Sequence, residues 1–260
     1  MSARPNLHNY HVGPENTVIG ALKVLGPVDS PQLGDQRDLL IWLPPSYARS
    51  DRHYPVLYMH DGQNLFDRAT GFAGQEWQVD ETMTALSGEG VEAIVVGLPH
   101  GGKQRMSEYN PFPEHRRGRG RKYLKFLVHT VKPLIDAEFR TLPDRAHTGI
   151  MGSSMGGLIS LFGFFHWPNT FGFVGAMSPS LWVGGGALYR YLEGAPYVPG
   201  RVYIDNGTRE GSAKPLDRML QHKGYRPGEN LLYVEEKGGE HTEAAWAGRL
   251  PNALRFLLRA

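Results

Sequence analysis

The stretch from His147 to His166 reads HTGIMGSSMGGLISLFGFFH, and its pattern predicts a strand, a tight turn and a helix. The turn contains the spacing G-x-S-x-G, centred on Ser154. A serine on such a strained turn projects its hydroxyl, and small residues such as Gly152 and Gly156 let the strand and the helix approach each other. The start of the helix adds backbone donors beneath the serine. The alternative is a glycine-rich turn with two incidental serines, but the context favours Ser154 as a nucleophile.

Apolar runs and helical patterns alternate through the rest of the chain. The runs expected to form strands are Thr17–Leu25, Asp38–Leu43, Tyr54–His60, Glu92–Leu98, Phe171–Met177, Arg201–Asp205 and Leu231–Glu235. The expected helices are Trp77–Leu86, Lys122–Phe139, Thr242–Leu258 and two stretches near Leu188 and Leu216. This alternation predicts a single α/β domain over residues 1–260, with a mostly parallel sheet, helices on both faces and antiparallel N-terminal strands.

The composition excludes several classes of function. The 260 residues include no cysteine, which excludes a thiol nucleophile, a disulfide scaffold and a cysteine-ligated metal site. A net charge of +2 is too small to indicate nucleic-acid binding, and the lack of an apolar run of about 18 residues argues against a membrane span. Neither a phosphate-binding loop nor an H-E-x-x-H motif is present, so we expect no metal and no organic cofactor. The polar segment Met1–Thr17 does not resemble a signal peptide, so we expect a cytoplasmic protein.

A serine nucleophile needs a base to take its proton and an acid to orient that base. In α/β proteins with a G-x-S-x-G turn the chain order is serine, acid, histidine, so the candidate bases are His222 and His241. His241 follows the last expected strand in a glycine-rich loop, whereas His222 falls inside a helical stretch. We therefore expect His241 to be the base, the alternative being a surface histidine before the last helix. Two carboxylates qualify as the acid by position: Asp205 at the end of the preceding strand, and Glu210 further out on the loop that follows it.

The negative charge that develops on an attacked carbonyl oxygen needs hydrogen-bond donors, which form an oxyanion hole. One donor is expected from the backbone N–H of the residue after the serine, Met155. The other is expected from the loop after Tyr54–His60, two strands before the nucleophile strand. That loop reads Asp61-Gly62-Gln63-Asn64, so the N–H of Gln63 is the candidate.

Several blocks of the sequence resemble the "Putative esterase" family, which includes enterochelin (siderophore) esterases and feruloyl esterases. The blocks are YPVLYMHDGQNLFD (Tyr54–Asp67), RMSEY (Arg105–Tyr109), GSSMGG (Gly152–Gly157), SPSLW (Ser178–Trp182), NGTREG (Asn206–Gly211) and EHTEAAW (Glu240–Trp246). The resemblance covers nearly the whole chain after about Thr17. It implies an α/β-hydrolase fold and a serine carboxylesterase that cleaves small-molecule esters through an acyl-enzyme intermediate.

Residue by residue, the resemblance matches Ser154 to the family's nucleophile and His241 to its base. It matches Glu210 to the carboxylate of the family's G-T-x-[DE] segment, which favours Glu210 over Asp205. Gln63 follows the Asp-Gly pair that precedes the oxyanion residue in relatives. Two alternatives to ester hydrolysis are acyl transfer to another alcohol by the same residues and a catalytically silent binding protein on the same fold.

Four residues are candidates for contact with the substrate. Trp182 resembles an aromatic wall near the serine in relatives, and Trp77, near the oxyanion loop, could serve similarly, although either could simply be core. Asp61 and Arg105 are the other two candidates. Arg105 could also form a buried ion pair with Glu108 that shapes the pocket.

The densest charge run is HRRGRGRK, from 115 to 122. Its basic part, Arg116–Lys122, could attract an anionic ester such as a catecholate siderophore. The alternative is a solvated loop before the helix expected at Lys122–Phe139. Nucleic-acid binding is not expected, because aromatic residues are not interleaved with the basic ones.

Overall fold

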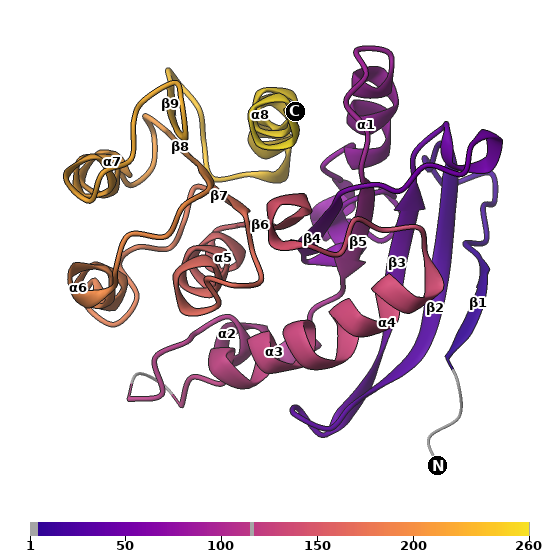
Figure 1. Ribbon diagram of the computed structural model, residues 1–260, viewed down its shortest axis with the longest axis horizontal. Coiled ribbons are helices and arrows are strands. Elements are labelled where there is room, and N and C mark those ends of the chain that lie inside the picture. The colour runs from indigo at the N-terminus through magenta and orange to yellow at the C-terminus, as the bar shows by residue number, and fades with distance from the viewer. Residues whose placement is uncertain (1–4, 115–116, 260) are drawn as a thin grey trace.

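The computed structural model describes residues 5–114 and 117–259. The described residues form a nine-stranded sheet in the order β1-β2-β3-β5-β4-β6-β7-β8-β9, with helices on both faces (Figure 1). The strands are β1 (Asn6–Asn9), β2 (Ala21–Ser30), β3 (Asp35–Leu43), β4 (Val56–His60), β5 (Ile94–Leu98), β6 (Thr148–Ser153), β7 (Phe173–Met177), β8 (Arg201–Gly207) and β9 (Leu231–Glu236). The helices are α1 (Val79–Ser87), α2 (Arg105–Glu108), α3 (Gly120–Phe126), α4 (Lys132–Glu138), α5 (Met155–His166), α6 (Ala187–Gly194), α7 (Lys214–His222) and α8 (Glu243–Leu258).

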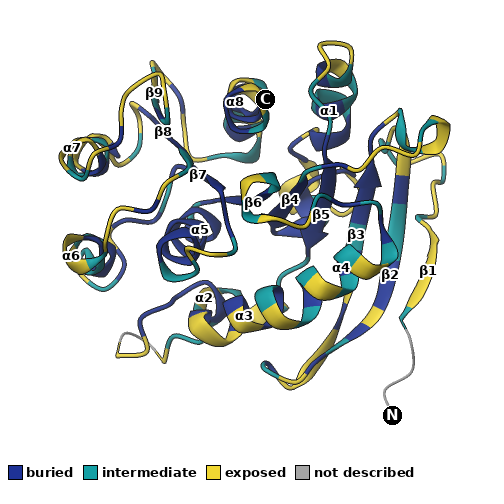
Figure 2. Ribbon diagram, viewed as in Figure 1, coloured by how far each residue is buried: buried dark blue, intermediate teal, exposed yellow. Residues whose placement is uncertain are grey.

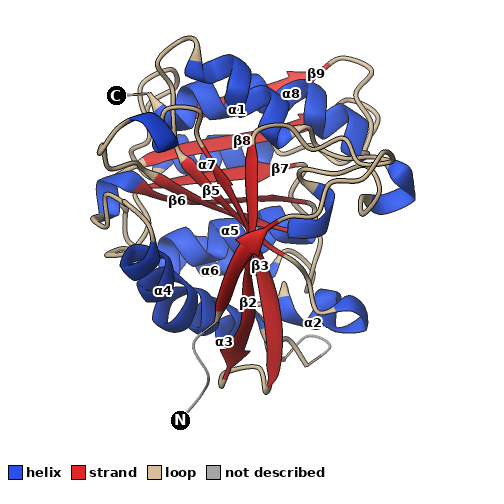
Figure 3. Ribbon diagram, turned by 90° about the vertical axis from the view of Figure 1, so that its right-hand side faces the viewer, coloured by secondary structure: helices blue, strands red, loops and turns tan. Residues whose placement is uncertain are grey.

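The strand directions divide the sheet into two parts. β1, β2 and β3 pair antiparallel with one another in turn, and β3 also pairs antiparallel with β5. Every pair from β5 through β4 to β9 is parallel. The sheet twists strongly between β2–β3 and β7–β8 (Figure 3). The predicted fold class, a mostly parallel sheet with antiparallel N-terminal strands, is confirmed.

The N-terminal strands differ from expectation in two ways. β1 was not expected, because its four residues are all exposed and show no apolar alternation. The strand expected at Thr17–Leu25 is β2, which begins at Ala21 and continues past Gly26-Pro27 to Ser30. A proline predicts a strand end because it cannot donate a ladder hydrogen bond. Here the register shifts between Leu25 and Val28, so the proline lies at an irregularity and the strand resumes after it.

The helix expected at Lys122–Phe139 begins at Gly120 and contains a π-helical segment, Leu127–Val131, between α3 and α4. Buried residues recur along it every four positions, at Tyr123, Leu127, Val131 and Ile135. Four positions exceed the 3.6 residues of an α-helical turn, and the wider π turn keeps these side chains on one face.

The sheet separates two apolar cores. Side chains of α1 and α8 pack on one face, and those of α3, α4, α5, α6 and α7 pack on the other. The strands β4, β5, β6 and β7 are buried along their whole length (Figure 2), as expected for strands covered by helices on both sides. The turn between β6 and α5 therefore follows one of these buried strands.

Two helices are apolar over much of their length. α5 spans 12 residues and α8 spans 16, whereas a helix that crosses a bilayer needs about 20 apolar residues. In the part of the chain that the structure describes, no helix is long and apolar enough to cross a membrane.

A buried ion pair fixes α2 against the sheet. Glu108 of α2 is fully buried, and its Oε1 accepts a hydrogen bond from Nη2 of Arg37 on β3 at 2.6 Å. The ion pair expected between Arg105 and Glu108 is therefore wrong. Arg105 instead reaches Asp61 in the loop after β4, while the sheet supplies the cation for Glu108.

Replacing Arg37 by methionine should lower the free energy of unfolding by about 3–5 kcal/mol, because Glu108 would remain buried without its cation. Arg226→Met is the matched control, since Arg226 pairs with Glu229 and both side chains are exposed, at 75% and 67%. That change should cost less than about 1 kcal/mol. Urea unfolding followed by circular dichroism measures both losses, and equal losses would contradict the prediction.

Candidate active site

Ser154 lies in the turn between β6 and α5 with a strained backbone. Its φ of 55° and ψ of −119° are rarely adopted by residues other than glycine. A Cβ atom at Gly152 would come within 2.8 Å of the carbonyl carbon of Gly156, so a larger residue does not fit between strand and helix. The Ser154 N–H donates to the carbonyl of Met177 on β7 at 2.9 Å. These contacts hold the serine at the carboxyl end of β6.

The hydroxyl of Ser154 has a hydrogen-bonding neighbour in Ser180. The two Oγ atoms lie 3.2 Å apart, and the Ser180 N–H donates to the Ser154 carbonyl at 2.9 Å. Ser180 is itself buried, so it orients the Ser154 hydroxyl from the protein side of the turn.

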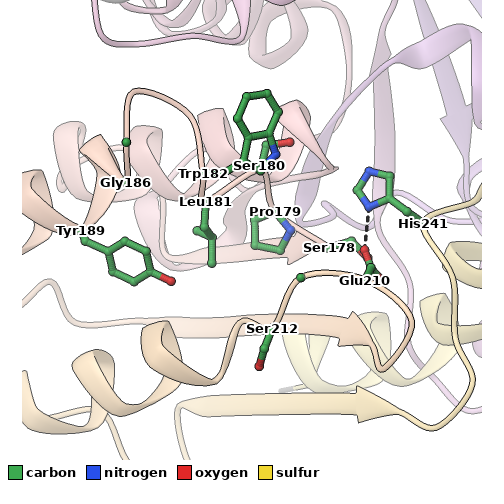
Figure 4. A pocket seen from close by; sticks show the side chains of 12 residues that line it. Ser178, Pro179, Ser180, Leu181, Trp182, Gly186, Tyr189, Glu210, Ser212 and His241 are labelled. Atoms are coloured by element: carbon green, nitrogen blue, oxygen red, sulfur yellow. Dashed lines mark hydrogen bonds and ion pairs between the residues drawn. The ribbon is translucent and has the colours of Figure 1, made fainter.

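His241 and Glu210 form a close pair beside this turn (Figure 4). His241 Nδ1 lies 2.6 Å from Glu210 Oε2. The other oxygen, Oε1, accepts hydrogen bonds from the Gly207 N–H and the Ser178 hydroxyl, each at 2.7 Å. Burial opposes ionisation of Glu210, but these three hydrogen bonds hold its pKa below the usual value. The imidazole of His241 also stands edge-on to the ring of Trp246, with centroids 5.0 Å apart.

Asp205, the other carboxylate considered as the acid, has different neighbours. It accepts hydrogen bonds from the Ser178 N–H at 3.0 Å and from the Tyr203 hydroxyl at 2.8 Å. Its Oδ2 lies 3.1 Å from Nε of Arg249 on α8. Burial raises the pKa of Asp205 to about 6, although the arginine and the hydrogen bonds oppose the shift. The geometry thus pairs Glu210 with His241 and Asp205 with Arg249.

Arg249 and Ser178 link this network, and the sequence analysis had singled out neither. Nη2 of Arg249 donates to the Ser178 hydroxyl at 2.9 Å and lies 3.7 Å from Glu210 Oε1. Nη1 donates to Glu236 on β9 at 2.8 Å. The Trp246 indole N–H also donates to the Ser178 hydroxyl, at 2.9 Å. The sequence pointed to Ser178 only through the block SPSLW, which begins with this residue.

Gln63 lies in a short 3-10 turn, Gly62–Asn64, directly after β4. A Cβ atom at Gly62 would come within 2.7 Å of the carbonyl carbon of Gly97, so the turn packs directly on β5. The Gln63 carbonyl accepts from the Thr70 hydroxyl at 2.7 Å, and its side-chain oxygen accepts from the His100 N–H at 3.3 Å. Both ends of the residue are therefore held in place.

Two neighbouring cavities meet at His241. The first, of about 410 Å³, is lined by Asp61, Gln63, Asn64, Thr70, Phe72, His100, Arg105, Ser153, Ser154, His241, Glu243 and Trp246. The second, of about 620 Å³, contains Glu210, Trp182 and Tyr189 as well as His241 (Figure 4). Met155 is the first residue of α5, so its N–H has no acceptor within the helix. Ser154, Gln63 and His241 thus line the first cavity, and Glu210 lines the second together with His241.

Asp61 and Arg105 pair with each other at the edge of the first cavity. Nε and Nη2 of Arg105 donate to the two oxygens of Asp61, each at 2.7 Å. The guanidinium also lies over the ring of Tyr109, 5.2 Å from its centroid. The two charges largely compensate each other, so this pair shapes the cavity wall without adding net charge.

The two tryptophans proposed as substrate contacts occupy different environments. Trp182 is 68% exposed and lines the second cavity. Trp77 is 1% exposed and packs against Trp246, with ring centroids 5.6 Å apart. Trp77 therefore belongs to the core beneath the site, which is the structural alternative given for it above.

The basic run makes contacts away from both cavities. His115 and Arg116 lie outside the described residues. Arg119 donates to the carbonyl of Leu33 at 2.6 Å. Arg121 donates to a backbone carbonyl in the preceding loop and lies over the ring of Phe162. These contacts favour the interpretation of the run as a surface segment before α3.

The sheet topology and the serine turn together define an α/β-hydrolase fold. The chain belongs to the esterase family described as "Putative esterase", whose model matches residues 30–257.

Relatives of known sequence include a bacterial protein and a siderophore esterase. The chain is 26% identical over 253 residues to "Uncharacterized protein YbbA" of Bacillus subtilis (strain 168), covering 89% of this chain and 96% of that protein. It is 29% identical over 164 residues to the iron(III) salmochelin esterase of Escherichia coli O6:H1, covering 55% of this chain and 40% of the relative.

Solved structures show the same fold. The enterochelin esterase from Shigella flexneri matches with a TM-score of 0.73 at 19% identity, covering 97% of this chain and 60% of that one. A ferulic acid esterase matches with a TM-score of 0.71 at 20% identity, covering 99% of both chains. The chain therefore spans less than two thirds of the siderophore esterases it matches here.

Replacing Glu210 by glutamine should reduce stability at neutral pH and have less effect in acid. Because the folded-state pKa of Glu210 lies below its ordinary value of 4.5, its ionisation stabilises the fold above that pH. This contribution is lost as the pH falls through the lowered pKa. The difference in unfolding free energy between wild type and variant, measured with urea at about pH 7 and about pH 3, should shrink in acid.

Glu240→Gln is the control for this comparison, because the Glu240 side chain is 55% exposed and pairs with exposed Arg209. It should change stability little at either pH. If the loss of unfolding free energy caused by Glu210→Gln is the same at the two pH values, the lowered pKa of Glu210 is contradicted.

Proposed function

We propose that the protein is a serine carboxylesterase that cleaves its substrate through a covalent acyl–serine intermediate. Ser154 attacks the ester carbonyl, and His241 takes the serine proton and passes it to the leaving alcohol. Glu210 holds the imidazole in the tautomer whose Nε2 accepts that proton. Water then attacks the acyl-enzyme with His241 again as base, which releases the acid and restores the serine.

The observation that carries this proposal is the 2.6 Å contact between His241 and Glu210 beside the cavity that contains Ser154. A carboxylate at Nδ1 is what a histidine base requires, and the lowered pKa of Glu210 keeps that carboxylate ionised at neutral pH. The Ser154 hydroxyl lies 3.2 Å from the Ser180 hydroxyl in this structure, and the reaction requires that it donate to His241. Catalytic hydrogen bonds commonly tighten only when substrate binds.

The backbone N–H groups of Met155 and Gln63 are proposed to bind the oxygen that becomes negative during attack. Met155 offers an N–H of the first turn of α5, which has no acceptor within the helix and lies at its positive end. Gln63 lines the same cavity as Ser154, and the contacts of its carbonyl and side chain hold it in place. Each such donor contributes roughly 3 kcal/mol of transition-state stabilisation.

The proposed substrates are esters with an aromatic acyl group, of the feruloyl or catecholate siderophore type. The exposed indole of Trp182 beside the second cavity offers a face for stacking, and Tyr189 lines the same cavity. The relatives named above include a siderophore esterase and a ferulic acid esterase. The neutralised Asp61–Arg105 pair is consistent with a substrate held by stacking more than by charge.

Ser154→Ala should reduce kcat/KM for p-nitrophenyl butyrate by at least about a thousandfold, because the nucleophile is lost while the oxyanion donors remain. Ser153→Ala is the matched comparison, since Ser153 precedes the nucleophile and is buried in β6. It should retain activity within about tenfold of wild type. Wild-type activity that survives Ser154→Ala would refute the proposed mechanism.

Trp182→Ala should lower kcat/KM for methyl ferulate by about two- to tenfold, through loss of an aromatic contact. The rate for methyl butyrate, which has no ring to stack, should stay nearly constant. Trp182→Phe keeps an aromatic face and should restore most of the activity towards methyl ferulate. Equal losses on both esters would place Trp182 outside acyl recognition.

A further inference from the structure

Three carboxylates converge at the start of α1, away from the serine. Glu76 precedes the helix, and Asp80 and Glu81 lie in its first turn. One carboxylate oxygen from each of the three lies within 4.8 Å of the others. Such a cluster would be strongly repulsive if all three groups were ionised without a counter-charge.

The second observation is that this cluster leaves buried oxygens unpaired. Glu76 Oε1 accepts from the Thr17 hydroxyl at 2.5 Å, and Asp80 Oδ2 accepts from the Ile19 N–H at 2.7 Å. In the described part of the chain, Glu76 Oε2, Asp80 Oδ1 and Glu81 Oε2 are buried and have no hydrogen-bond partner. Asp80 is fully buried and its carboxyl interacts with that of Glu81, so solvent does not compensate its second oxygen.

A helix N-terminus alone does not explain the arrangement. Acidic residues in the first turn of a helix are stabilised by its dipole, which accounts for Asp80 and Glu81 as residue types. It does not account for a third carboxylate from outside the helix, or for three buried oxygens without donors.

We propose that Glu76, Asp80 and Glu81 bind a divalent cation of the hard type, Ca²⁺. Calcium takes oxygen ligands at about 2.3–2.6 Å, so oxygens on opposite sides of the ion lie up to about 5 Å apart, in agreement with the spacing observed. Carboxylate oxygens favour Ca²⁺ or Mg²⁺ over the softer transition metals. Glu76 also lines a surface hollow of about 410 Å³, which gives the ion a route from solvent.

The cation would join three segments of the chain. Thr17 and Ile19 bring the segment before β2 to the carboxylates, and Asp80 and Glu81 belong to α1. Glu76 is followed by Trp77, whose ring packs on Trp246. The ion would therefore stabilise the fold at the side of α1 and α8, and it would take no part in the reaction at Ser154.

The test is calcium binding by the intact protein after treatment with EDTA. Isothermal titration with CaCl₂ should give one calcium per chain. The melting temperature should rise by roughly 5–10 °C when calcium is about a hundredfold above its Kd. MgCl₂ should act more weakly, because Mg²⁺ keeps several waters and gains less from buried carboxylates.

Asp80→Asn and Glu76→Gln should each abolish the calcium-dependent rise. Glu193→Gln is the matched control, because Glu193 is an exposed carboxylate on α6. That variant should respond to calcium as wild type does. If Asp80→Asn does not fold, Glu81→Gln and the wild-type titration carry the test.

Absence of calcium binding and of any thermal response in wild type would overturn the proposal. A response that persists in Asp80→Asn would also overturn it, because the cation would then bind elsewhere. Burial raises the pKa of Asp80 to about 8, so a proton is the competing occupant. If Asp80→Asn is more stable than wild type and wild type ignores calcium, the carboxyls share a proton and no cation site exists.

Discussion

The buried guanidinium of Arg249 is the interaction on which the geometry around His241 depends. A buried cation is tolerated only where anions and hydrogen-bond acceptors surround it. Arg249 meets Asp205 at the end of β8, Glu236 at the end of β9 and the Ser178 hydroxyl after β7. Three strand ends are thereby fixed to α8 through one side chain. Glu210 lies at the edge of this arrangement. One of its oxygens accepts a hydrogen bond from the Ser178 hydroxyl, and the other contacts Nδ1 of His241.

The sequence predicted well those features that depend on neighbouring residues. The strand, turn and helix around Ser154 were predicted correctly because glycines at fixed offsets and a continuous apolar run are local signals. The parallel sheet followed from the alternation of runs for the same reason. β1 was missed because its pairing with β2 rests on backbone hydrogen bonds and not on an apolar pattern. The Gly26-Pro27 sequence predicted a strand end, but β2 continues to pair with β3 beyond it.

The sequence does not predict which charged side chains pair around the candidate site, because the partners lie far apart in the chain. Asp205 lies near the end of β8 and Glu210 in the loop that follows it, and position alone does not distinguish them. Arg249, far along the chain on α8, lies against Asp205 and leaves Glu210 beside His241. Likewise Arg105 and Glu108 are close in sequence, yet each pairs with a residue from another element, Asp61 and Arg37. The partner of a charged side chain depends on which elements the fold brings together, and no local pattern encodes that.

α8 follows the last strand of the sheet in the sequence, which has a consequence for the order in which the molecule is made. Trp246 and Arg249, which hold Ser178, His241 and the two carboxylates in place, leave the ribosome after every strand of the sheet. A nascent chain can therefore form the turn at Ser154 while the histidine still lacks its support. The contacts that hold His241 and Ser178 are therefore complete only after α8 has joined the sheet.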